Sequence, residues 1–181
     1  MNLSDYKKLS HDELAYICLC REPKARCQSE DEVYSFLAPY VFRRQEHFFV
    51  ISTNVQHEVV DFANIAIGSD NHLDLTPRDV FRNAILANAH QVILAHNHPS
   101  GSPDWSADDI STTAKLVDCG RLLGIPVVDH ILIYNDEFVN LASQCDLYKL
   151  GTFRDSRGLT SNNDYTYKVI AQLTSPEGRL D

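Results

Sequence analysis

The sequence predicts an α/β domain in which a layered, mixed β-sheet is flanked by helices. Residues 48–53 and 91–95 are apolar, β-branched runs with the length and composition of buried strands. A helical segment with its own N-cap residue follows each region, one beginning at Thr76 and the other at Ser106. Strands and helices that alternate in this way favour one sheet covered by helices.

Three segments follow from changes in composition along the chain. Residues 1–42 contain two short helical patterns, and the second begins with the capping-box form Ser29-x-x-Glu32. Residues 43–150 form the predicted domain. Residues 151–181 are polar with little periodicity, so we expect a C-terminal tail that is partly disordered or docks on another molecule.

Within the domain, capping residues and apolar runs set the order β-β-α-β-α-β-β. Pro77 stands at the first position of the first helix with Asp79 in its first turn, and Gly124 ends the second helix. The predicted elements are strands at 48–53 and 58–67, a helix from Thr76, a strand at 91–95, a helix at 106–123, and strands at 127–133 and 138–142.

Composition narrows the class of protein. Hydrophobic residues make up 44% of 181 residues, and no apolar run approaches the ~18 residues that span a bilayer. The first residues lack the apolar stretch of a secretory signal, so we expect a soluble, cytoplasmic protein that does not bind membranes. The five cysteines include no C-x-x-C pair, which argues against a disulfide framework and a four-cysteine zinc site.

The charge balance argues against nucleic acid as the main partner. Asp and Glu number 25 against 16 Lys and Arg, a formal net charge of −9. Proteins that bind duplex DNA present a basic face, and this sequence has no dense basic cluster. We therefore expect no strong nucleic-acid binding by this chain alone.

The segment from His96 to Asp109 carries the pattern of a metal site. Side chains two apart on an extended strand point to the same face, so His96 and His98 can both reach one ion. A carboxylate in the first turn of the next helix would complete two histidines and one acid, which leaves a fourth position for water, as in catalytic zinc sites. Spacing alone leaves Asp104, Asp108 and Asp109 as candidates for that carboxylate.

The same segment resembles the JAMM (MPN+) metallopeptidase motif, H-x-H-P followed by S-x-x-D, and most closely its RadC-type form H-N-H-P-S-G. The similarity covers roughly residues 43–147. It implies an MPN/JAB-like fold, whose layers resemble those of cytidine deaminases, and one Zn²⁺ per chain held by His96, His98 and Asp109. It also implies Glu46 as the catalytic acid/base and Ser106 as the hydroxyl that polarises the substrate.

These roles predict a zinc-dependent metallohydrolase, a metallopeptidase or isopeptidase that cleaves an amide bond in a peptide or protein substrate. The alternative is a RadC-type protein, linked to DNA repair or acting as a scaffold, whose metal site is not used for proteolysis. Residues 1–40 contain no glycine, which argues against a DNA-binding helix-hairpin-helix there. Zinc deaminases need a P-C-x-x-C pair that is absent. We interpret His130 as a hydrogen-bonded core residue rather than a ligand.

Overall fold

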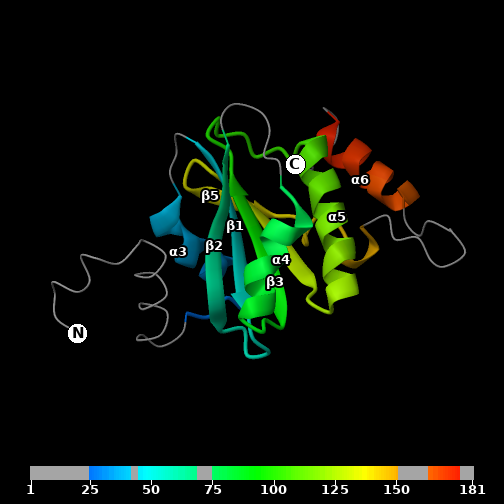
Figure 1. Ribbon diagram of the computed structural model, residues 1–181. Helices are drawn as coiled ribbons and strands as arrows, with labels where there is room; N and C mark the ends of the chain where they lie inside the picture. Colours follow the sequence, from blue (N-terminus) through cyan, green and yellow to red (C-terminus); the bar gives the residue numbers. More distant parts are fainter. Residues whose placement is uncertain (1–24, 42–44, 69–74, 151–162, 176–181) are drawn as a thin grey trace, which may run out of the picture.

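One mixed sheet organises the protein. The computed structural model describes residues 25–41, 45–68, 75–150 and 163–175, and its strands run in the order β2-β1-β3-β4-β5 (Figure 1). Only β3 and β4 pair in parallel; the other neighbours are antiparallel. The strands are β1 (Glu46–Thr53), β2 (Val59–Gly68), β3 (Gln91–Asn97), β4 (Val127–Tyr134) and β5 (Glu137–Asn140).

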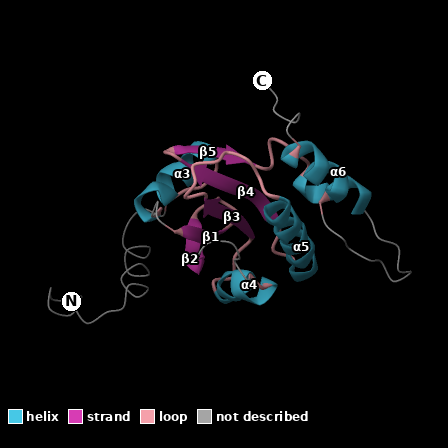
Figure 2. Ribbon diagram, turned by 90° about the horizontal axis from the view of Figure 1, so that it is seen from above, coloured by secondary structure: helices cyan, strands magenta, loops and turns pink. Residues whose placement is uncertain are grey.

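Helices cover both faces of this sheet. Seen from above, α3 lies against one face and α4 and α5 against the other (Figure 2). The helical elements are α3 (Glu30–Leu37), η1 (Ala38–Tyr40), α4 (Pro77–Leu86), α5 (Ala107–Leu123), η2 (Leu147–Lys149) and α6 (Asn163–Thr174). The predicted fold class, a mixed sheet flanked by helices, is confirmed.

The helix boundaries follow the capping residues of the sequence. The Ser29 side chain accepts from the Glu32 amide at the start of α3. Thr76 and Asp79 form a reciprocal capping box on α4. Gly124 ends α5 in the left-handed conformation, with φ of 70°. The first helix predicted within residues 1–42 lies outside the described residues.

Alternation along the central strands divides the core between the two faces. Phe48 and Val50 join the cluster beneath α4 and α5, whereas Phe49 and Ile51 pack toward α3. β3 alternates in the same way, and all seven of its residues are buried. Consecutive residues at the end of β3 therefore face different helices, and this separation places the functional side chains.

One sequence expectation differs from the structure. Within the expected polar tail, residues 163–174 form α6, which packs on the cluster around α5 through buried Val169 and half-buried Ile170 and Leu173. These apolar residues recur at helical spacing, so this part of the tail docks on its own domain rather than on another molecule.

The described cysteines and helices bear on the expectations from composition. Cys27 is buried in the core beside α3, and Cys119 and Cys145 are also free thiols. Cys18 and Cys20 lie outside the described residues. No helix in the part of the chain that is described has both the length and the apolar character to cross a membrane.

Candidate metal centre

The end of β3 presents two histidines. His96 is 1% exposed and lies two residues after Leu94, which belongs to the cluster beneath α4 and α5, so both face that side. His98 follows the strand, and its Nε2 lies 3.2 Å from Nε2 of His96. The Nδ1 of His98 lies 3.1 Å from the Ser102 carbonyl oxygen, a contact in which the ring donates and Nε2 keeps its lone pair.

The first turn of α5 supplies a carboxylate to the same point. Asp109 Oδ1 lies 3.5 Å from His96 Nε2, and Asp109 Oδ2 lies 3.6 Å from His98 Nε2. Within the described residues these three side chains form the one group of His, Cys, Asp or Glu arranged to hold a metal ion. Asp104 and Asp108, which spacing left open, are not part of it.

The donor set fits a tetrahedral ion. Zinc bound at about 2.0–2.1 Å by tetrahedral nitrogen and oxygen ligands separates those ligands by about 3.3 Å. The two imidazole nitrogens are 3.2 Å apart, and each lies 3.5 or 3.6 Å from a different oxygen of Asp109. Two imidazoles and one carboxylate also leave a fourth position, which is the composition of catalytic rather than structural zinc sites.

Glu46, the first residue of β1, lies close enough to the site for its charge to affect His98. β1 and β3 are antiparallel with Phe48 opposite His96, so two residues further along the same register Glu46 stands opposite His98. Glu46 shares the face of Phe48, which packs against the His96 ring. The charge of Glu46 is one of the influences that raise the pKa of His98.

Asn97, between the two histidines, holds the backbone on both sides of Glu46. Its Oδ1 accepts from the His47 amide at 2.9 Å, and its Nδ2 donates to the Gln45 carbonyl at 2.9 Å. Backbone pairing between β1 and β3 ends where Phe48 lies opposite His96. Beyond that pair, the Asn97 side chain makes the hydrogen bonds between the two strands. The middle residue of the H-N-H segment therefore fixes where β1 begins.

Ser106 serves as the N-cap of α5 and as a partner of Asp109. Its hydroxyl accepts from the Asp109 amide at 3.1 Å and donates to Asp109 Oδ2 at 2.6 Å. The backbone amide of Ser106 also donates to Oδ2, at 2.9 Å. Two hydrogen bonds thus orient the carboxylate toward the histidines, while the predicted contact of Ser106 with a substrate stays a prediction.

The electrostatics favour an ionised Asp109. Burial alone would raise its pKa, but contacts with His96 and His98 and the Ser106 hydrogen bond hold that pKa far below its usual range. Burial lowers the pKa of His98, yet the Asp109 hydrogen bond, the Ser102 carbonyl and nearby negative charge outweigh burial and raise it. The ionised carboxylate of Asp109 therefore gives the site a negative charge that favours a bound cation.

An apolar wall encloses the inner side of the site. Trp105 is 3% exposed and its ring lies against both His96 and His130. Phe48 contacts the same two histidines from β1. His130, on β4, is fully buried and its pKa is well below the usual value, first because of burial and then because of His96. The interpretation of His130 as a hydrogen-bonded core residue agrees with this placement.

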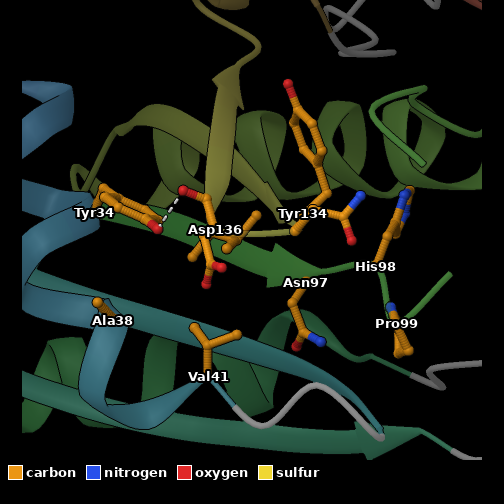
Figure 3. Close-up of a pocket in the computed structure, with 10 residues that line it drawn as sticks. Tyr34, Ala38, Val41, Asn97, His98, Pro99, Tyr134 and Asp136 are labelled. Carbon is orange, nitrogen blue, oxygen red and sulfur yellow. Dashed lines mark hydrogen bonds between the residues drawn. The ribbon is translucent and has the colours of Figure 1, made fainter. Parts of the chain in front are cut away.

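A small cavity opens on the opposite face of the sheet, beside His98. Its volume is about 170 Å³, and Asn97, His98 and Pro99 form one side of it. Figure 3 shows Tyr34 at the other side, where its hydroxyl donates to the Asp136 carbonyl oxygen at 2.7 Å. Of the three candidate metal ligands, only His98 lines this cavity.

The sheet, its helices and the two-histidine, one-carboxylate group at the end of β3 together define a domain of the JAB type with a candidate metal centre. Residues 27–146 match the model of the RadC-like JAB domain. The chain belongs to this family, as its sequence motif predicted.

Similar proteins extend the comparison. The chain is 39% identical over 126 residues to a UPF0758 protein of Geobacillus thermodenitrificans, which covers 70% of this chain and 52% of that protein. It is 38% identical over 124 residues to one of Methanococcoides burtonii, covering 68% and 54%. A third, from Bacillus cereus, is 45% identical over 100 residues, covering 55% and 44%. The chain thus spans about half the length of these relatives, whose names state no activity.

Proposed function

We propose that this protein is a zinc-dependent metallohydrolase that cleaves an amide bond in a peptide or protein, as a metallopeptidase or isopeptidase. The observation that carries the proposal is the convergence of His96, His98 and Asp109 on one point, with the charge of Glu46 close enough to affect His98. A structural zinc site would fill all four positions with protein ligands, whereas three ligands and an adjacent acid suit hydrolysis.

The residues divide the work of hydrolysis. His96, His98 and Asp109 would hold Zn²⁺, which when bound lowers the pKa of a water molecule from ~15.7 toward ~7. Glu46 accepts the proton of the attacking water and returns it to the leaving amine. Asn97 keeps Glu46 in reach by fixing the backbone on either side of it.

Ser106 has two tasks in this proposal. Its hydroxyl orients Asp109 through the 2.6 Å hydrogen bond, so the same hydroxyl lies beside the ligand carboxylate. When a substrate carbonyl enters, the hydroxyl turns from Asp109 to the developing oxyanion, while the Ser106 amide still holds the carboxylate.

The test uses zinc-loaded protein and a library of internally quenched peptides that includes lysine isopeptide linkages. We expect cleavage by the wild type, and loss of turnover with zinc retained in Glu46→Gln, which removes the base without touching a ligand. Glu58→Gln, in the connection between β1 and β2, is the matched control and keeps activity. Stoichiometric zinc without cleavage of any library member would overturn the proposal and favour a scaffold.

A further inference from the structure

His130 is a buried histidine that lies outside the metal group yet contacts one of its members. It is 0% exposed and lies on β4, next to β3 in the sheet. Its Nε2 is 2.9 Å from Nδ1 of His96, and its Nδ1 is 2.6 Å from the hydroxyl oxygen of Thr113 on α5. Thr113 is itself fully buried. The two rings and the hydroxyl therefore form an unbroken chain of polar contacts in an apolar wall.

The protons in this chain have one consistent arrangement. A hydroxyl has one proton, and the Thr113 hydroxyl gives it to the backbone carbonyl of Asp109 at 2.7 Å, because a carbonyl oxygen only accepts. The second contact of Thr113 must then be one in which it accepts, so Nδ1 of His130 carries a hydrogen. A neutral imidazole has one donor and one acceptor nitrogen, so a hydrogen on Nδ1 leaves Nε2 of His130 as the acceptor.

The arrangement determines which nitrogen of His96 carries its proton. Because Nε2 of His130 accepts, Nδ1 of His96 must donate to it across the 2.9 Å contact. The free lone pair of His96 is then on Nε2, the atom that points at His98 and Asp109. The reverse arrangement would place an N–H bond where a metal ion binds.

We propose that Thr113 and His130 are positioning residues that fix His96 in the Nδ1–H tautomer and so present its Nε2 lone pair to the metal. Each metal-ligating histidine has its second nitrogen held by a hydrogen-bond partner, and such partners are worth about 10–100-fold in metal affinity. The chain starts at the Asp109 carbonyl and ends at His96, so it joins the first turn of α5 to β3. This inference rests on the proposed metal site but not on hydrolysis.

The experiment compares two substitutions of Thr113. Thr113→Ser keeps the hydroxyl, whereas Thr113→Val keeps the shape and removes it. Thr53→Val is the matched control: Thr53 is a fully buried threonine on β1 whose hydroxyl has no hydrogen-bond partner among the described residues. Long-range ¹H–¹⁵N spectra of metal-free protein at about pH 8 report the tautomer of each imidazole, and competitive titration with zinc reports affinity.

We expect the wild type, Thr113→Ser and Thr53→Val to show Nδ1–H on His96 and to bind zinc equally. Thr113→Val should mix the two tautomers of His96 and bind zinc about 10–100-fold more weakly. Wild-type His96 protonated on Nε2, or Thr113→Val with unchanged tautomer and affinity, would overturn the inference. The predicted tautomer and affinity pattern in a protein that cleaves no amide would reject the hydrolase and support the positioning chain.

Discussion

Replacing Asn97 by alanine tests how the sheet places Glu46. The asparagine is 2% exposed, and its side chain makes the two 2.9 Å hydrogen bonds to the backbone of Gln45 and His47. Alanine removes both bonds and leaves the chain at the start of β1 without its link to β3. We expect the variant to stay folded, with a loosened β1 start and a displaced Glu46.

The loss in the free energy of unfolding comes from the two lost hydrogen bonds and from the buried backbone donor that is left without a partner. Each neutral hydrogen bond contributes about 1 kcal/mol net, and a buried donor left without a partner costs about 1–3 kcal/mol more. The His47 amide is the buried donor in this case. The free energy of unfolding should therefore fall by about 3–5 kcal/mol, a large part of the total of about 5–15 kcal/mol that keeps a domain folded.

Urea unfolding followed by the fluorescence of Trp105, the only tryptophan in the chain, measures that loss. Hydrogen exchange of peptides covering residues 45–50 locates it. Asn140→Ala is the matched control, because Asn140 is also a buried asparagine with side-chain hydrogen bonds, to Glu30, Asp129 and Ser143, but it lies on β5. Asn140→Ala should lose stability without faster exchange at residues 45–50. An Asn97→Ala variant with wild-type stability and unchanged exchange there would refute the reasoning.

Three further predictions concern α5 and the core. Ser106→Ala should cost about 1 kcal/mol of stability through the lost N-cap and weaken zinc binding, while Ser106→Thr preserves both in urea and zinc titrations; equal behaviour of the two variants would contradict the roles given to Ser106. Gly120→Ala should lower the melting temperature measured by circular dichroism, because the added Cβ would lie 2.6 Å from the Ile125 carbonyl oxygen. The steric cost of about 1–3 kcal/mol exceeds the helix-propensity gain of about 1 kcal/mol. A higher melting temperature would contradict this prediction. Burial, with the charge of Glu32, raises the pKa of Cys27 from 9.0 to about 12, so its thiol should resist alkylation in the folded protein. The free energy of unfolding should fall as pH rises from 9 toward 12, because over that range the thiol ionises in the unfolded chain but not in the folded one. Rapid labelling of Cys27 in peptide maps at neutral pH would contradict this prediction.

Local signals in the sequence predicted most of the fold and the three candidate ligands. His96 and His98 end a strand, and Asp109 falls three residues after the N-cap Ser106, so spacing within one short segment brings them together. The choice of Asp109 over its neighbours needed the family resemblance, since spacing alone does not decide which side chain faces the ion. Within the described residues, Asp109 is the carboxylate that lies with His96 and His98.

Other parts of the site depend on contacts that no local pattern reveals. Glu46 lies fifty residues before His96 in the chain and reaches the site through the register between β1 and β3. The two hydrogen bonds from Asn97 to the backbone of β1 depend on the same register, although the position of Asn97 between His96 and His98 is a signal in the sequence. Thr113 and His130 come together only because α5 packs on β4. Pairing between distant segments is set by the whole sheet, so sequence spacing could not supply it.

Helix α6 was not predicted from the sequence for a different reason. Its surrounding residues are polar, and the average composition of residues 151–181 obscured three apolar side chains at helical spacing. A shorter window over Val169, Ile170 and Leu173 would have shown an amphipathic pattern. Tertiary contact with the cluster around α5 then provides the burial that an isolated helix of this length lacks.

The X-ray absorption fine structure of the protein loaded with one equivalent of zinc tests the central claim most directly. We expect a bound ion with nitrogen and oxygen ligands at about 2.0–2.1 Å and with the scattering pattern of two imidazoles. We expect no sulfur ligand at about 2.3 Å. His96→Ala should remove one imidazole from that signature. A sulfur shell, or zinc that is lost on desalting, would contradict a metal centre made by His96, His98 and Asp109.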